Sequence, residues 1–400
     1  MSGTVNRVGT ARARVVHVIT MLEWGGAQEN TLYSVEHLDP GRYDRVLVAG
    51  KGGMLDGRAC GIPDLRVILL DDLVREVRPV RDAKAFLALR SILREEKRVA
   101  GGDPLVVHTH SSKAGILGRA AARAAGADAV VHSIHGFGFH DGQSKSTHAL
   151  YVGLERMASN WTDAFVAVSE ENIRGGVQEG IFRRERCRLI RSGFDTARFL
   201  AGSRAVGRMI LGIPEGVPVV GTVAVFKPQK APLDFVETAR RVALEIPDSR
   251  FVMVGDGELR GETERTVALI GMSDRFSFLG WRPEVPELMA AFDVFLLTSR
   301  WEGLPKVVPQ ALIAGCPVVA TAVDGTREIV DPGVDGVLAP PGDVDALRRG
   351  VVDILTGRLR LDAAKKRDRL VREFDQDEMV RAQERLYAEI LAGKGFPGWS

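Results

Sequence analysis

The sequence predicts an α/β protein made of two doubly wound parallel-sheet domains. Short aliphatic segments of strand length alternate with helical segments along the chain, and this pattern starts again in the second half. The composition agrees, since 45% of the residues are hydrophobic, only 6% are aromatic and 44 are glycine. Strands that are buried on both faces of a parallel sheet are typically aliphatic. At 400 residues, the chain is long enough for two hydrophobic cores.

The N-terminal half alternates between strand and helix from Val15 onward. Val15–Thr20 (VVHVIT) has the pattern of a buried strand and leads through Glu23–Gly26 into a helical stretch at Ala27–Leu38. A second helical pattern covers Lys84–Lys97. Further strands are expected at Val46–Val48, Val67–Leu70, Leu105–His108, Val130–Ile134 and Ala164–Val168.

The alternation restarts after Pro218 and defines the second domain. Strand Val219–Val225 is followed by a helix at Leu233–Leu244. Polar residues near Arg191–Phe199 interrupt the first pattern, so we expect one domain at 1–195 and another at 196–375. Residues 376–400 are expected to hold an amphipathic helix, Gln376–Leu391, that packs back toward the first domain. Further strands are expected at Phe251–Val254, Phe276–Leu279, Val294–Leu297 and Val318–Ala320.

Charge and cysteine content exclude several classes of protein. A formal net charge of +2 excludes an acidic disordered chain and gives no support for nucleic-acid binding. Cys60, Cys187 and Cys316 are few and far apart, which indicates a reducing compartment. Met1–Arg14 lacks the apolar core of a signal peptide, and no apolar run approaches the roughly 20 residues of a membrane-spanning helix. We therefore expect a cytoplasmic protein that can be peripheral on the inner face of the cell membrane.

Loops after the strands carry the unusual residues of the N-terminal half. Ligands of open parallel sheets bind beyond the carboxyl ends of the strands. Gly25 and Gly26, in the loop after the first expected strand, would let a ligand come close to the start of a helix. A tight turn between strand and helix is the alternative interpretation. The full dinucleotide-binding glycine pattern is absent, which disfavours a nicotinamide enzyme. His110, in VVHTHSSKAG, and His135, in HSIHGFGFHDGQ, are candidates for contacts to sugar hydroxyls, the alternative being histidines that bond backbone carbonyls.

The sequence gives no clear metal site. Six of the eight histidines lie between His108 and His148, but no pair at i, i+4 has a third ligand, so zinc is not expected. Asp-x-Asp pairs, the usual carboxylate clamp for a metal-bound nucleotide sugar, occur only at Asp343/Asp345 and at Asp375/Asp377. Both pairs lie where helices are expected to begin, so we interpret them as structural. We expect neither a metal nor another cofactor.

Two lysines follow the first strand of the C-terminal half. Lys227 and Lys230, in VFKPQKA, can place ammonium groups near a diphosphate and neutralise the charge that develops as it leaves. A solvated surface turn is the alternative for this short sequence.

The most informative stretch is Thr298–Thr321, TSRWEGLPKVVPQALIAGCPVVAT, between two expected strands. Glu302 can accept hydrogen bonds from sugar hydroxyls, and the amides from Gly303 onward can face an anion at a helix start. Pro305 suits the first helical turn, while Pro309 indicates that this turn is distorted.

Taken together, these segments resemble glycosyltransferase family 4, whose members have the GT-B architecture of two Rossmann-like domains facing a central cleft. The resemblance runs from Val15 to about Leu391 and extends to bacterial members that act on surface polysaccharides or lipid-linked glycans. Its motifs are the Gly25-Gly26 loop, HTHSSKAGILGR, HGFGFHDGQ, VGDGELR, FLGWRPEVPELMAAFDVFLLTS and EGLPKVVPQALIAGCPVVAT. Gln28 stands where the family's Gly-Gly-Ala-Glu segment has glutamate.

The resemblance implies a catalytic role for His135, Lys230 and Glu302. His135 and Glu302 would contact the transferred sugar, and Lys230 the diphosphate. Lys227 would replace a family arginine that falls near Val225. His110 and Lys113 would face the acceptor. The implied nucleotide-sugar site comprises Gly25, Gly26, Lys227, Lys230, Gly255, Trp281, Arg282, Glu302, Gly303, Leu304, Val307 and Gln310.

Gln310 departs from the family pattern. The family has a second glutamate at this position, eight residues after the first, which usually bonds the ribose hydroxyls. An amide can still bond a diol but lacks charge-assisted strength.

The resemblance implies a retaining, metal-independent hexosyltransferase that uses a nucleotide diphosphate sugar, with a UDP-sugar favoured. The acceptor would be a hydroxyl of a glycan or of a lipid-linked molecule. A nucleotide-sugar epimerase and a catalytically silent nucleotide-sugar-binding relative are the alternatives.

A basic stretch between residues 75 and 98 suggests contact with an anionic membrane surface. Phe86, Leu87, Leu89 and Leu93 are interleaved with eight arginines and lysines there. A solvated amphipathic helix is the alternative.

Overall fold

A computed structural model describes residues 11–139 and 143–399, and His140 of the HGFGFHDGQ motif lies outside them. The chain divides into two compact units. Unit 1 contains the residues up to Gly193 together with those from Gln376 onward, and unit 2 contains Phe194–Asp375. The division falls two residues before the boundary expected from the sequence. Each unit is described separately below.

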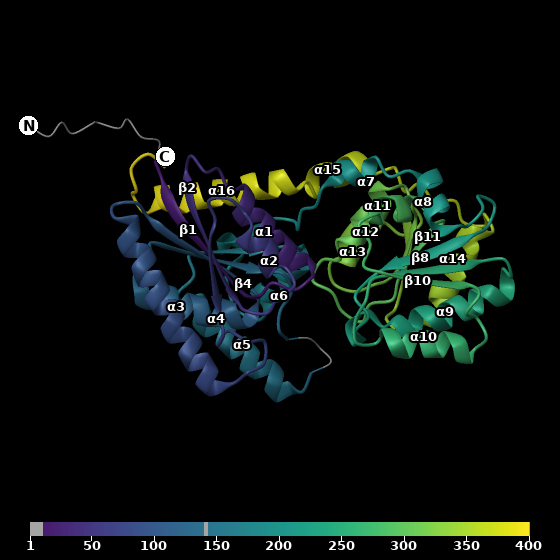
Figure 1. Cartoon of the computed structure of the whole chain (residues 1–400), viewed down its shortest axis with the longest axis horizontal. Helices are drawn as coiled ribbons and strands as arrows, with labels where there is room; N and C mark the ends of the chain where they lie inside the picture. Colours follow the sequence, from purple (N-terminus) through teal and green to yellow (C-terminus); the bar gives the residue numbers. More distant parts are fainter. Residues whose placement is uncertain (1–10, 140–142, 400) are drawn as a thin grey trace, which may run out of the picture. The chain divides into compact units, whose positions relative to one another are not determined.

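Unit 1 is built on a parallel sheet. Among the described residues the sheet has seven strands in the order β3-β2-β1-β4-β5-β6-β7 (Figure 1). In β1, which is the third strand in this order, Val16 is paired with Val46 on one side and with Val107 on the other. The strands are β1 (Ala13–Met21), β2 (Tyr43–Gly50), β3 (Arg66–Leu70), β4 (Leu105–His110), β5 (Ala129–Ile134), β6 (Ala164–Ala167) and β7 (Cys187–Leu189).

Helices cover both faces of this sheet. Successive side chains of a strand point to opposite faces, so Val106 and Val107 of β4 belong to different cores. Val107 packs with helices α3 and α4, and Val106 packs with Tyr387 of α16. The helices of unit 1 are α1 (Gly26–His37), α2 (Asp56–Cys60), α3 (Pro79–Ala100), α4 (Ser112–Ala125), α5 (Lys145–Ser159), α6 (Glu170–Gln178) and α16 (Gln376–Gly393).

Unit 2 repeats the architecture with a parallel sheet in the order β10-β9-β8-β11-β12-β13. Phe235 of α9 and Leu347 of α14 pack with Val220 and Leu296 of the sheet in one core. The strands are β8 (Val219–Val223), β9 (Arg250–Val254), β10 (Phe276–Gly280), β11 (Val294–Leu297), β12 (Val318–Thr321) and β13 (Gly336–Ala339). The helices are α7 (Thr196–Leu200), α8 (Arg204–Leu211), α9 (Pro232–Glu245), α10 (Arg260–Leu269), α11 (Val285–Ala291), α12 (Val307–Ile313), α13 (Thr326–Ile329), α14 (Val344–Leu355) and α15 (Arg367–Glu373).

Both sheets reverse the direction of winding at one place. In unit 1 this switch point lies between β1 and β4, and in unit 2 it lies between β8 and β11. Connections leave the two neighbouring strands toward opposite faces there, which opens a crevice beyond their carboxyl ends. The loops after these four strands are therefore the first places to look for ligand-binding residues.

The predicted strands and the two parallel sheets are confirmed, with a few differences. The short strands β7 and β13 were not expected, and β8 ends at Val223 rather than Val225. All three cysteines are free thiols. Within the described ranges, none of the helices combines the length and the apolar character that spanning a bilayer requires.

Candidate functional site

In unit 2, two predicted catalytic residues meet at the switch point. Lys230 lies in the loop after β8, and Glu302 lies in the loop after β11, the neighbouring strand. The Lys230 ammonium forms an ion pair with Oε1 of Glu302. Both side chains are largely buried, with 16% and 6% of their area exposed. The positive charge therefore neutralises a carboxylate that would otherwise repel an approaching anion.

Glu302 is held by two further contacts. The Ser299 hydroxyl donates to its Oε1 over 2.5 Å, and its backbone amide donates to Oδ2 of Asp324 over 2.6 Å. Asp324 follows β12 and has a positive φ of 34°, a conformation that residues other than glycine rarely adopt. Residues in the loops after β8, β11 and β12, which are adjacent strands, therefore hold Glu302 in place.

The loop with Lys230 is tied to the loop with Glu302 through the backbone. Thr298 donates its hydroxyl to the carbonyls of Lys230 and Ala231 over 2.9 and 3.0 Å. The amide of Arg300 donates to the Gln229 carbonyl over 2.7 Å. These bonds set the position of the lysine relative to the glutamate before any ligand arrives.

Gly255 has a packing role in this structure. A Cβ at Gly255 would lie 2.1 Å from the Ala224 carbonyl oxygen, and its φ is 122°. Glycine therefore lets the loop after β9 press against the loop after β8, which leads to Lys230. Whether this backbone also touches a nucleotide remains a prediction.

The remaining predicted donor residues lie along the carboxyl edge of the same sheet. Trp281 and Arg282 follow β10, and Trp281 is 48% exposed. Lys227 immediately precedes the short 3₁₀ turn that contains Lys230.

The helix after Glu302 begins later than the sequence suggested. Helix α12 starts at Val307, so Pro305 lies before the helix and not in its first turn. Gly303 and Leu304 likewise belong to the loop, whereas Val307 and Gln310 belong to α12. The amide of Val308 bonds to the Pro305 carbonyl in a tighter, i−3 pattern at the helix start.

In unit 1, a pocket of about 500 Å³ lies at the switch point between β1 and β4. Lys113, which opens α4 beside the pocket, forms an ion pair with Asp82 of α3. Gly25 precedes α1 and Gly26 is its first residue, and Gly25 is extended, with a φ of 172°. The pocket combines polar groups with an apolar wall, formed by Ile19, Met21, Val77, Ile116, Leu117, Tyr151 and Leu154.

His110 lies beneath this region and is only 2% exposed. Its Nε2 is 2.9 Å from Nδ1 of His17, and its Nδ1 is 3.2 Å from Nε2 of His135. Since both ring nitrogens are engaged, this position does not allow the direct contact with an acceptor that the sequence suggested. The structure instead places His110 behind His135.

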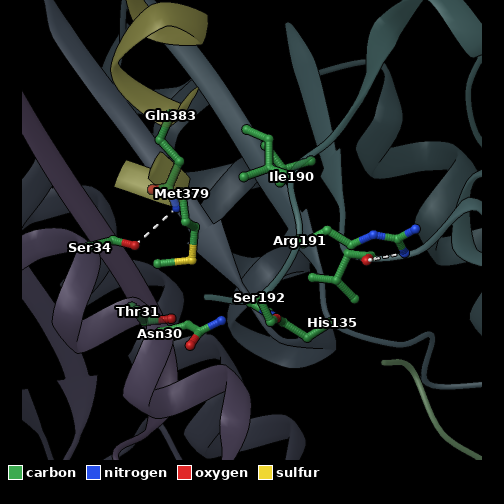
Figure 2. A pocket seen from close by; sticks show the side chains of 11 residues that line it. Asn30, Thr31, Ser34, His135, Ile190, Arg191, Ser192, Met379 and Gln383 are labelled. Atoms are coloured by element: carbon green, nitrogen blue, oxygen red, sulfur yellow. Dashed lines mark hydrogen bonds between the residues drawn. The ribbon is translucent and has the colours of Figure 1, made fainter. Parts of the chain in front are cut away.

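His135 lines a small pocket together with Ser192 and residues of α1 and α16 (Figure 2). Asn30 and Thr31 of α1 face this pocket, and Gln383 of α16 donates to Ser34 over 3.0 Å at its rim.

Burial keeps the inner histidines neutral. Loss of solvent lowers the pKa of His17 to about 3 and lowers the pKa of His108 and His110 well below the usual value. Neighbouring imidazoles lower the pKa of His108 and His110 further.

One cluster of possible metal ligands occurs among the described residues, and the sequence did not indicate it. Nitrogen atoms of His17, His108 and His110 all lie within 4.8 Å of one another. The spacing rule missed this group because His17 comes from β1 and the other two from β4. Their nitrogens already bond to one another and to Tyr387, as described below.

The basic segment of α3 differs from the expectation. Leu89 and Leu93 are fully buried in the core of unit 1, so they cannot contact a membrane. Leu87 and Val80 are 57% and 72% exposed, and Val77, just before the helix, is also 72% exposed.

Two family models match this chain. The model described as Glycosyltransferase Family 4 matches residues 24–198, and the model described as Glycosyl transferases group 1 matches residues 217–357. The chain is 30% identical over 390 residues to the UDP-Gal:alpha-D-GlcNAc-diphosphoundecaprenol alpha-1,3-galactosyltransferase of Escherichia coli. That alignment covers 96% of this chain and 99% of the relative.

Solved structures share the fold. The Anabaena protein HepE, crystallised with UDP and glucose, superposes with a TM-score of 0.76 at 21% identity, over 94% of this chain and all of HepE. WaaG, a glycosyltransferase involved in lipopolysaccharide biosynthesis, gives a TM-score of 0.74 at 18% identity, over 93% of this chain and 99% of WaaG. The two Rossmann-like domains expected for a GT-B protein are thereby confirmed.

Proposed function

Because this chain belongs to glycosyltransferase family 4, we propose that it moves a hexosyl group from a UDP-sugar to a hydroxyl of a lipid-linked glycan in surface polysaccharide synthesis. We further propose that the anomeric configuration is retained and that no metal ion takes part. The observation that carries the donor side is the ion pair between Lys230 and Glu302 at the switch point of unit 2.

This ion pair suits a donor that carries both a pyrophosphate and a polyhydroxylated sugar. The ammonium of Lys230 stabilises the charge that develops on the leaving diphosphate, which needs no metal for this purpose. Glu302, oriented by Ser299 and by the bond from its own amide to Asp324, accepts hydrogen bonds from sugar hydroxyls.

Transfer then proceeds as a front-face displacement. The bond between the anomeric carbon and the diphosphate oxygen breaks, and the acceptor oxygen forms a bond on the same face of the sugar. The acceptor's proton passes to the departing diphosphate oxygen. We keep His135 as the predicted contact to the sugar that is transferred.

The carboxylate pairs that could hold a metal have other partners. Asp343 caps α14 by accepting from the amide of Ala346 over 2.9 Å, and Asp345 is 2.7 Å from Arg241. Asp377 accepts from the hydroxyl of Tyr33. These contacts support the proposal that lysine rather than a metal clamp binds the pyrophosphate.

The pocket of unit 1 suits an acceptor with a charged and an apolar part. Lys113 and Arg75 line the pocket beside the apolar wall described above. The relative in E. coli, by its name, acts on a sugar linked to diphosphoundecaprenol. We propose that this pocket binds a lipid diphosphate, with the cations toward the diphosphate and the wall toward the first isoprene units.

Turnover with a defined donor and acceptor tests the function. We expect UDP release from a UDP-hexose to require a lipid-diphosphate-linked sugar and to be unchanged by EDTA, with product of retained configuration in the NMR spectrum. Consumption of the donor alone, with a changed sugar, would indicate an epimerase. Tight UDP-sugar binding without turnover would indicate a silent relative, and loss of activity in EDTA would exclude the metal-free mechanism.

A separate flotation experiment tests contact with the cytoplasmic face of the membrane. Val77, Val80 and Leu87 are exposed beside basic residues of α3, which supports adsorption to anionic lipid. We expect the protein to co-float with vesicles that contain phosphatidylglycerol more than with pure phosphatidylcholine vesicles. Equal flotation would remove the membrane contact from the proposal without affecting the transfer reaction.

Gln310→Glu is expected to tighten UDP binding. A carboxylate on α12 would give the ribose diol a charge-assisted partner, so the Kd of UDP should fall about fivefold. Isothermal titration calorimetry measures this change, with Gln376→Glu at the start of α16 as a matched control. An unchanged Kd at position 310 would remove the ribose assignment.

A further inference from the structure

A chain of hydrogen bonds crosses the core of unit 1 from the C-terminal helix to His135. The hydroxyl of Tyr387, on α16, is 3.4 Å from Nε2 of His17 on β1. The chain continues from Nδ1 of His17 to Nε2 of His110 over 2.9 Å. It reaches His135 through the 3.2 Å contact between Nδ1 of His110 and Nε2 of His135.

A second branch leaves the same hydroxyl. The Tyr387 oxygen is 2.5 Å from Nδ1 of His108, and Nε2 of His108 is 2.8 Å from the Ser133 hydroxyl. Tyr387 is thus the only group that joins the two branches in the part of the chain described. Tyr387, His17, His108 and His110 are all 2% exposed or less.

Each link must contain one hydrogen atom. Tyr387, His17, His108 and His110 are almost completely buried and bonded to one another, where an unpaired charge is costly, so each ring is neutral and the phenol keeps its proton. A neutral imidazole donates through one nitrogen and accepts through the other. If every link is satisfied, the acceptor to which the Tyr387 hydroxyl donates, either His108 or His17, therefore determines the tautomer of every ring.

Two arrangements satisfy all the links. If Tyr387 donates to His108, then His17 donates to Tyr387 through Nε2, His110 donates to His17, and His135 donates to His110. The proton of each ring is then on Nε2. If Tyr387 donates to His17, every bond reverses and the proton of each ring is on Nδ1.

The geometry favours the first arrangement. A phenol is a stronger acid than a neutral imidazole, so the bond in which the phenol donates should be the shorter one. The Tyr387 oxygen is 2.5 Å from His108 and 3.4 Å from His17, which indicates that Tyr387 donates to His108.

We propose that Tyr387 acts through His17 and His110 as a positioning residue that holds His135 in the Nε2–H tautomer, with an acceptor lone pair on Nδ1. The consequence of this tautomer for catalysis rests on the proposed function, in which His135 contacts the transferred sugar. A ring with a lone pair on Nδ1 accepts a hydrogen bond from a sugar hydroxyl, whereas the opposite tautomer would donate one. The tautomer itself can be observed without any turnover.

The test compares the ¹⁵N-histidine NMR spectrum of the full chain with those of Tyr387→Phe and Tyr43→Phe. In the wild type, His17, His108, His110 and His135 should all show the Nε2–H pattern. Tyr387→Phe leaves Nε2–H of His17 without an acceptor, so His17, His110 and His135 should shift toward Nδ1–H. Single His→Gln variants assign the signals.

Tyr43→Phe is the matched control. Tyr43 is equally buried, its ring centroid lies 6.0 Å from that of Tyr387, and its hydroxyl bonds the Glu384 carbonyl rather than the histidines. This variant should leave all four tautomers unchanged. A change in Tyr43→Phe equal to that in Tyr387→Phe would mean that general loosening of the core, and not the hydrogen-bond chain, sets the tautomer.

Three other results would overturn the proposal. The first is an Nδ1–H pattern in the wild type, and the second is a His135 tautomer that Tyr387→Phe does not change. The third is one tightly bound zinc per chain by elemental analysis, with His17, His108 and His110 showing metal-bound nitrogens.

In steady-state kinetics, Tyr387→Phe should lower kcat about tenfold and leave the Kd of UDP unchanged. If no variant and no wild-type protein transfers sugar, the proposed function fails while the tautomer result still stands.

Discussion

Replacing Lys230 with alanine is expected to lower kcat by roughly 10²- to 10³-fold, since removal of one preorganised group that stabilises developing charge has an effect of this size. The ammonium is the cation held beside Glu302 at the switch point of unit 2. Without it, the leaving diphosphate loses its positive partner and Glu302 keeps an uncompensated negative charge. Steady-state release of UDP with saturating acceptor measures the change.

Loss of stability must be separated from loss of catalysis in this variant. The side chain of Glu302 is only 6% exposed, so Lys230→Ala also leaves a nearly buried carboxylate without its ion-pair partner. The double variant Lys230→Ala/Glu302→Gln removes that charge and should recover much of the thermal stability without recovering turnover. Lys51→Ala, which removes a lysine paired with Asp71 on the surface of unit 1, serves as the control. Full activity of Lys230→Ala would contradict the mechanism.

Glu155→Ala is expected to destabilise unit 1 by about 3–5 kcal/mol, the usual effect of removing one partner of a buried ion pair. Arg119, on α4, is fully buried, with its Nη2 2.6 Å from Oε2 of Glu155 and its Nε 2.8 Å from the Gly115 carbonyl. Burial lowers the pKa of Arg119 and the carboxylate of Glu155 opposes that shift. The urea midpoint of each unfolding transition of the full chain measures the loss.

Two comparisons show whether burial causes this effect. Arg119→Met/Glu155→Leu removes both charges and should cost less than Glu155→Ala alone, because no charge is left unpaired. Glu95→Ala breaks an exposed ion pair with Arg98 on α3 and should change the stability far less than Glu155→Ala does. Equal losses in Glu155→Ala and Glu95→Ala would show that burial does not determine the effect.

Local sequence patterns located most of the strands and the loops that follow them. Val15–Thr20 and Val294–Leu297 are largely aliphatic runs that follow a charged residue, Arg14 and Asp293 respectively, and both lie within observed strands. The short strands β7 and β13 escaped prediction because Arg188 interrupts the first and Gly336 opens the second, so neither shows a continuous aliphatic run. The start of α12 was placed too early because Pro305 suits a first helical turn, whereas the helix begins at Val307.

The faces of helices and the partners of single side chains were harder to predict. The alternation of basic and apolar residues in α3 does not by itself tell which leucines face the core, and the structure buries Leu89 and Leu93 while exposing Leu87. His110 was expected to face an acceptor, but β4 directs its ring into the interior, between His17 and His135.

By itself, the sequence determined the two parallel-sheet domains, the family resemblance and the loops that hold Lys230, Glu302 and His135. These features depend on neighbouring residues and on the period of a strand or a helix, which can be read locally. Only the tertiary structure decided that Lys230 neutralises Glu302, 72 positions away, and that Tyr387 lies against His17, 370 positions away. Such contacts depend on strand order and on how helices pack against the sheet, and the local sequence does not encode either.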